Sequence, residues 1–121
     1  MKNNYKQGEI YWVDLNPSSG SVQNGLRPCL VLQTNAVSDL GKTTIIAPLT
    51  TRKLDNIYPY EVFIKASSKN KLQENSKVKL DQVRVIDKRK ISKKIGILES
   101  ELFDGVLVSL DIIFDRSRDF S

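Results

Sequence analysis

The spacing of apolar residues changes once along this 121-residue chain, and that change restricts the fold. As far as position 87 the apolar residues form short runs separated by Asn, Gly, Pro and Ser, a pattern typical of β-strands joined by turns. Between positions 100 and 114 they recur at helical spacing instead: Leu102, Phe103, Val106, Leu107, Leu110, Ile113 and Phe114. The sequence therefore predicts a mainly β chain with a C-terminal α-helix over Ser100–Phe114, for which Ser100 is the expected N-cap.

Five segments are expected to form strands: 9–15, whose apolar residues lie on both faces, and 28–33, 43–49, 60–65 and 77–87. In the last of these, Val78 occupies an even position and Val83 an odd one. Because side chains alternate along a strand, this change of parity predicts a β-bulge or sharp bend at Asp81 and Gln82. Pro48 predicts an edge or bulge near the end of its strand. Five or six strands followed by one helix predict a small curled barrel in a single domain, 1–121.

Composition excludes several classes of protein. Hydrophobic residues make up 40% and charged residues 27%, as in a soluble globular domain. No apolar run is long enough to span a bilayer, and the polar N-terminal segment has no signal-peptide core, so the cytoplasm is the expected compartment. A single cysteine, Cys29, excludes an internal disulfide and a multi-cysteine zinc site.

The charge is basic, with a net value of +5, and it is concentrated near the C-terminal part of the strand region. Residues 77–94 hold eight lysines and arginines but only two acids, Asp81 and Asp87. This segment fits either a nucleic-acid contact or a solvated sheet edge that resists aggregation. The chain has no histidine, which excludes a ribonuclease working through a histidine pair and a Ser-His-Asp triad.

Two residues at the ends of loops are candidates for phosphate chemistry. Arg27 ends the predicted glycine-containing loop 16–27, and its guanidinium offers a planar, permanently charged fork that fits a phosphate. Thr50 follows an apolar strand, where its hydroxyl can bind a phosphate oxygen or a 2′-hydroxyl. The residues alone favour the simpler interpretation, an ordinary surface arginine and an ordinary strand threonine.

Ordered blocks of sequence resemble the MazF/PemK (Kid) toxins of bacterial toxin–antitoxin pairs. The blocks are GEIYWVDLNP at 8–17, GSVQNGLRPCLVL at 20–32 and KLDQVRVIDKRKI at 79–91, with a weaker match, IIAPLT, at 45–50. The resemblance extends from position 8 to about 110, in the family's order. It implies an SH3-like small barrel of the plasmid-maintenance toxin (CcdB/PemK) type and a homodimer.

The resemblance also implies an activity. Such toxins are mRNA interferases that cleave single-stranded RNA at short sequences without metal or cofactor, leaving a 2′,3′-cyclic phosphate and a 5′-hydroxyl. A cognate antitoxin covers the groove, and no membrane is involved. The family's functional arginine and threonine map to Arg27 and Thr50. From the resemblance and from the need of single-stranded bases for stacking and edge contacts, the expected RNA-binding residues are Gln23, Asn24, Thr51, Arg52, Lys53, Tyr58, Gln82 and Arg84.

Two departures from the family pattern leave alternatives open. Val22 stands where many relatives have glutamate, and since valine cannot accept a proton, the general base is unassigned. Asp81 replaces a common glutamate, which is a milder change. The first alternatives are a CcdB-like binder that poisons DNA gyrase and a catalytically inactive SH3-like binding module. A metal-dependent nuclease ranks below them, because the aspartates show no ligand spacing: Asp14, Asp39, Asp55 and Asp87.

Overall fold

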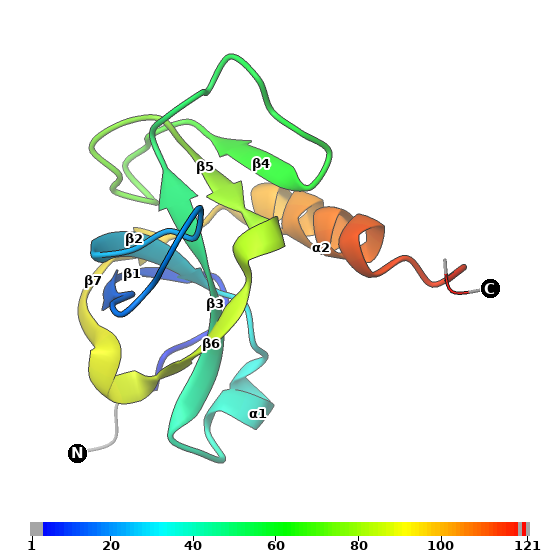
Figure 1. The fold of residues 1–121 in the computed structure, drawn as a ribbon. Coiled ribbons are helices and arrows are strands. Elements are labelled where there is room, and N and C mark those ends of the chain that lie inside the picture. The colour runs from blue at the N-terminus through cyan, green and yellow to red at the C-terminus, as the bar shows by residue number, and fades with distance from the viewer. Residues whose placement is uncertain (1–3, 119, 121) are drawn as a thin grey trace.

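The computed structural model describes residues 4–118 and 120, so positions 1–3, 119 and 121 of the expected domain lie outside the described residues. Seven antiparallel strands form the sheet, in the order β4-β5-β3-β2-β1-β7, with β6 paired to β3 (Figure 1). The predicted class, mainly β with a C-terminal helix, is confirmed. The elements are β1 (Glu9–Asp14), β2 (Leu26–Val31), α1 (Asn35–Ser38), β3 (Thr43–Thr50), β4 (Glu61–Ile64), β5 (Ser76–Lys79), η1 (Leu80–Gln82), β6 (Arg84–Asp87), η2 (Lys88–Lys90), β7 (Ile91–Ile97) and α2 (Ser100–Phe114).

Strand β3 is shared between two neighbours. Its first half pairs with β6 and its last two residues, Leu49 and Thr50, pair with β5. The 3₁₀ turn η1 separates these neighbours, which confirms the sharp bend predicted at Asp81 and Gln82. Pro48 lies between the two pairing registers, at the irregularity that its missing N–H predicts. The bend leaves Thr50 at the end of β3, opposite Lys77.

Strand β1 contributes to two cores, which explains its apolar residues on both faces. Ile10 packs with residues of β2, β3 and β5, while Val13 and Leu15 belong to a second cluster with Cys29 and Ile86. Trp12, on the same face as Ile10, is 37% exposed. The strand is therefore fixed on both sides, and Trp12 is left at the surface next to β2.

Helix α2 has the bounds that the sequence predicts, and it lies beside β4 and η1 at one end of the sheet (Figure 1). Val106 is fully buried on the core, but Leu107 and Phe114, which the periodicity placed on the same apolar face, are 46% and 72% exposed. The N-cap is Glu99, so the assignment of Ser100 was wrong. Ser100 is the first helical residue, and its hydroxyl donates to Glu101.

The structure differs from the prediction at three further places. β2 begins at Leu26, so Arg27 lies in a strand and not in the loop before it. Between the expected strands 28–33 and 43–49, where the sequence predicts no regular element, the structure has the short helix α1. β7 was not predicted, because its pairing with β1 is bulged and its residues 92–94 are all polar and exposed. Within the described residues, no helix is long and apolar enough to cross a membrane.

Candidate functional site

A cavity of about 440 Å³ opens beside the paired strands β1, β2 and β3. Arg27 from β2 and Thr50 from β3 both line it. Its other walls come from Trp12 of β1, from residues 71–76 before and at the start of β5, and from residues 93–95 of β7. The fold therefore brings the two predicted catalytic residues to one concave surface, built from segments far apart in the sequence.

Arg27 is half-buried and faces the cavity from a rigid ladder, opposite Val13 of β1. Its Nε donates to the carbonyl oxygen of Asn24 at 2.9 Å, which orients the guanidinium plane. Within residues 4–118 and 120, no hydrogen bond or ion pair occupies its terminal nitrogens, Nη1 and Nη2. A planar fork with two free donor groups suits a phosphate.

Thr50 is 6% exposed and ends β3. Its Oγ1 accepts a hydrogen bond from the backbone N–H of Arg52 at 3.2 Å. Because a hydroxyl can donate one proton while it accepts, this contact fixes Oγ1 and leaves its proton for a group bound in the cavity. Thr51, the next residue, is exposed and also lines the cavity.

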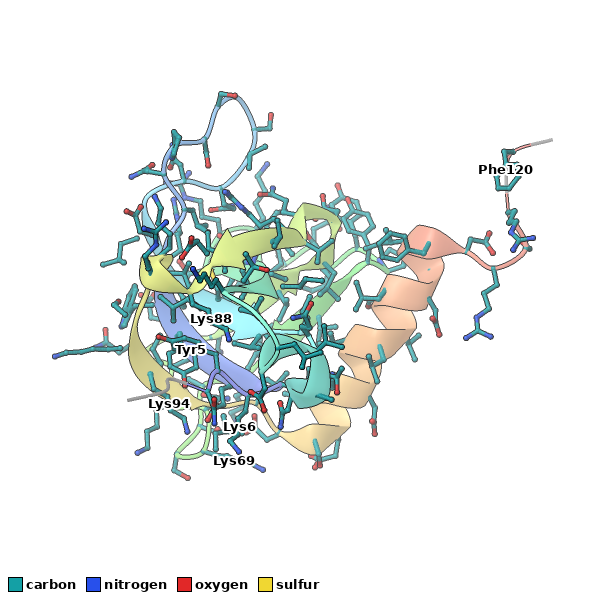
Figure 2. The ribbon with its side chains drawn as sticks, turned by 90° about the horizontal axis from the view of Figure 1, so that it is seen from below. Tyr5, Lys6, Lys69, Lys88, Lys94 and Phe120 are labelled. Carbon is teal, nitrogen blue, oxygen red and sulfur yellow. The ribbon has the colours of Figure 1, made fainter. Side chains whose placement is uncertain are left out.

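The remaining cavity walls are basic, with one acid. Lys71, Lys93 and Lys94 carry the positive charge, and Glu74 is the single carboxylate among the described lining residues. The ammonium of Lys94 lies 2.6 Å from Glu9 Oε2. Burial by itself would raise the pKa of Glu9, but hydrogen bonds from Lys94, Lys6 and Tyr11 lower it below its usual value. Figure 2 shows Lys94 near Lys6 at one end of the molecule.

These wall residues were not predicted. Lys93 and Lys94 belong to the basic segment 77–94, where charge alone could not separate a ligand contact from a solvated edge. Lys71 and Glu74 lie in a polar connection that has no local signal of function. Only the tertiary packing of residues 71–76 beside β3 and β7 identifies them as part of the cavity.

Two predicted RNA-binding residues instead hold the loop that precedes β2. Gln82 Oε1 accepts from the backbone N–H of Gln23 at 2.8 Å, and Nη1 of Arg84 donates to the carbonyl oxygen of Leu15 and to Ser18 Oγ, both at 3.3 Å. Neither lines the cavity in the described structure. Their geometry makes them supports for loop 15–25, which carries Asn24, the acceptor for Arg27. RNA contact by Gln23, Asn24, Gln82 and Arg84 stays a prediction.

The other predicted RNA-binding residues lie on the loop 51–59 between β3 and β4. Arg52 and Lys53 are exposed, and Tyr58 is 46% exposed. The ring of Tyr58 stacks on Tyr60, with centroids 5.3 Å apart and planes at 1°. Thr51, at the start of this loop, lines the cavity, whereas Tyr58 and Tyr60 are outside its lining. Val22, in the earlier loop, is 46% exposed. Within the described residues, no group of three or more His, Cys, Asp or Glu could hold a metal ion.

Residues 6–114 match the model of a protein family described as the PemK-like, MazF-like toxin of type II toxin–antitoxin systems. The chain belongs to this family. The resemblance carried by the sequence blocks is therefore confirmed, over nearly the whole chain.

Relatives and solved structures of the PemK/MazF family agree. The chain is 36% identical over 107 residues to endoribonuclease EndoA of Bacillus subtilis (strain 168), covering 88% of this chain and 91% of that protein. It is similar in fold to crystalline MazF from Deinococcus radiodurans, with a TM-score of 0.80, 24% identity and coverage of 93% and 98%. A mycobacterial endoribonuclease in complex with its cognate antitoxin gives a TM-score of 0.77 and 18% identity, over 95% of this chain and 99% of that one.

Proposed function

We propose that this PemK/MazF-family chain is a cytoplasmic endoribonuclease toxin, formed by one domain over its whole length, that cleaves single-stranded RNA at short sequences. The cleavage needs no metal or cofactor and leaves a 2′,3′-cyclic phosphate and a 5′-hydroxyl. One observation carries the proposal: Arg27 and Thr50, from separate strands, line one basic cavity. The 36% sequence identity to endoribonuclease EndoA, over 88% of this chain, supports the same activity.

The chemistry follows from the side chains in the cavity. The 2′-oxygen of the RNA attacks the adjacent phosphorus, and the bond from phosphorus to the 5′-oxygen breaks. The free guanidinium nitrogens of Arg27 neutralise the phosphoryl oxygens, and Thr50 donates its hydroxyl proton to one of them. A guanidinium is too weak a base at neutral pH to take the proton itself. Removing one such donor costs about 10²–10³ in rate.

Glu74 supplies the proton acceptor that Val22 cannot. It is the carboxylate among the described residues of the cavity, and carboxylates serve as general bases within hydrogen-bond reach of their substrate. The proton of the 2′-hydroxyl passes to Glu74, and the departing 5′-oxygen takes a proton from water. Lys71 and Lys93 on the same walls add positive potential that attracts the RNA backbone.

Cleavage of a long RNA in the presence of EDTA tests this function directly. The purified chain should cut at one short motif and leave 5′-hydroxyl ends, and Arg27→Ala should lower kcat at least about a hundredfold. Arg89→Ala is the matched control, because Arg89 is exposed, pairs with Asp87 and lies outside the cavity. Intact RNA with the unmodified protein would refute the function and favour the gyrase-binding or inactive-module alternatives.

The proposed partners are single-stranded RNA, a cognate antitoxin and a second copy of the chain. The basic walls of the cavity suit an extended acidic segment of an antitoxin, and the solved complex of a related fold supports such a partner. Exposed apolar residues on α2 support the homodimer, because apolar patches on a protein surface often mark protein–protein contacts. These residues are Leu107, Val108, Ile112 and Phe114.

A further inference from the structure

The ammonium of Lys77 fastens the loop 51–59 to the sheet. Its Nζ donates to the carbonyl oxygens of Lys53 at 3.1 Å and Asn56 at 3.0 Å, and it lies 2.9 Å from Glu61 Oε1. An ammonium has three protons, and these three oxygens accept all of them. The side chain is 3% exposed, so the charge is buried and fully paired. Two of its three partners are backbone atoms of one loop.

Glu61 completes this clamp. Its side chain is 1% exposed, Oε1 also accepts from the backbone N–H of Tyr58 at 3.1 Å, and Oε2 pairs with Lys79 at 3.0 Å. Burial would raise the pKa of Glu61, but the hydrogen bonds from Lys77, Tyr58 and Lys79 lower it below its usual value. The carboxylate is therefore charged at neutral pH and fixes the far end of the loop.

The clamped loop connects the cavity to an aromatic pair of which one ring, that of Tyr58, is exposed. It begins directly after Thr50, which lies opposite Lys77 in the β3–β5 ladder. It ends near Tyr58 and Tyr60, whose rings are stacked, and Nζ of Lys77 lies 6.0 Å from the centroid of the Tyr58 ring. Aromatic rings are the surfaces on which proteins hold unpaired bases. One buried lysine thus contacts the middle of the loop, its aromatic end and, across the ladder, the strand of the candidate catalytic threonine.

We propose that Lys77 is a positioning residue that fixes the loop 51–59 and thereby determines which RNA bases are accepted beside the cut. The proposal rests on the proposed endoribonuclease function. Lys77 lies outside the cavity lining, so its charge acts on the loop and not on the bound phosphate. Holding a loop in its bound conformation removes the entropic cost of ordering it on binding, and that cost would otherwise weaken every base contact that the loop makes.

The test compares Lys77→Met with Lys79→Met. Each variant removes one of the two lysines that pair with Glu61 and leaves the other, so the buried carboxylate keeps a partner in both. Only Lys77→Met also removes the donor to the carbonyl oxygens of Lys53 and Asn56. A mapped digest of one long RNA gives the ratio of cuts at the preferred motif to cuts elsewhere. This ratio does not depend on the fraction of folded protein.

We expect Lys77→Met to lower this ratio about tenfold and to raise KM more than it changes kcat, because hydrogen bonds that order the loop are lost. Lys79→Met should keep the ratio within about twofold, since it leaves the loop contacts in place. An unchanged ratio in Lys77→Met, or equal changes in the two variants, would overturn the proposal.

Hydrogen exchange provides a readout that does not need activity. The amides of residues 52–58 should exchange about tenfold faster in Lys77→Met than in Lys79→Met. Equal protection of these amides in both variants would refute the clamp, whether or not the unmodified protein cuts RNA. Failure of the unmodified protein to cut RNA would refute only the proposed function. If Lys77→Met does not fold, Tyr58→Leu decides, because loss of the aromatic pair must then lower the cut-site ratio. A ratio unchanged by Tyr58→Leu would overturn the proposal.

Discussion

Gly96 is the position where one added carbon should damage the structure most. It lies in β7 against the segment that forms a wall of the cavity, and a Cβ built on it would lie 2.5 Å from the carbonyl carbon of Asn70 and 2.9 Å from the carbonyl oxygen of Lys69. Contacts below 3.0 Å are essentially not observed for real Cβ atoms. All of these atoms belong to the backbone, so Gly96→Ala must displace one segment of main chain from the other.

Asn70 cannot move without losing side-chain hydrogen bonds. It is fully buried, its Oδ1 accepts from the N–H groups of Ser67 and Leu72 at 3.0 and 3.1 Å, and its Nδ2 donates to the carbonyl oxygen of Lys65 at 2.9 Å. Overpacking costs roughly 1–3 kcal/mol, and each hydrogen bond stretched out of range adds about 1 kcal/mol. We therefore expect Gly96→Ala to lower the free energy of unfolding by about 3 kcal/mol and Tm by about 10 °C.

Gly105→Ala is the matched control. Gly105 lies inside α2, where a new Cβ would meet Val62 at the ordinary contact distances of 3.9 and 4.0 Å. Alanine in a helix interior should increase stability by about 0.5–1 kcal/mol. Urea denaturation monitored by circular dichroism measures both variants. A free energy of unfolding for Gly96→Ala within about 0.5 kcal/mol of that of the unmodified chain would refute the backbone clash, and so would a shift of the two variants in the same direction.

Three further outcomes are expected. Glu74→Gln should lower kcat about a hundredfold or more while KM changes little, and unchanged single-turnover rates would exclude Glu74 as the proton acceptor. Cys29 is fully buried, and burial raises the pKa of its thiol to about 12, although the charges of Arg84 and Arg27 act in the opposite direction. Iodoacetamide at pH 8 should therefore label Cys29 only in urea, and labelling of the native protein would contradict its burial. The affinity for an uncleavable RNA should fall as salt rises, with a slope reduced by about one in Lys93→Ala, whereas an affinity independent of salt argues against phosphate contacts in the cavity.

The sequence predicts those elements whose residues carry a regular, local pattern. α2 has its predicted bounds because its apolar positions repeat at helical spacing over the whole of residues 100–114. The bend at Asp81 and Gln82 was predictable because the parity of a strand cannot change without an irregularity. β7 was not predicted because bulges in its pairing with β1 interrupt the alternation of its side chains, and because its residues at 92–94 are polar and exposed.

The candidate site was only partly predictable for a related reason. Arg27 and Thr50 stand in blocks that resemble a family, so the sequence could single them out. Glu74 and Lys71 reach the cavity through long-range packing of an irregular segment, for which the sequence has no local pattern. Long-range packing also brings Arg84 to the loop 15–25, where it donates hydrogen bonds to Leu15 and Ser18. The sequence block singles out Arg84 as a candidate RNA contact but has no signal for this contact with the loop.

The assembly of the cavity from distant segments has a consequence for synthesis of the protein on the ribosome. Arg27 and Thr50 emerge early, but the wall at residues 71–76 and the strand at 93–95 emerge later, and Arg84 reaches back 69 positions to hold Leu15. Domains complete their long-range contacts only after the chain is available. A nascent chain that has emerged as far as position 70 therefore holds both candidate catalytic residues without the later walls of the cavity. If the proposed cleavage needs those walls, we expect such a chain to leave the messenger being translated intact.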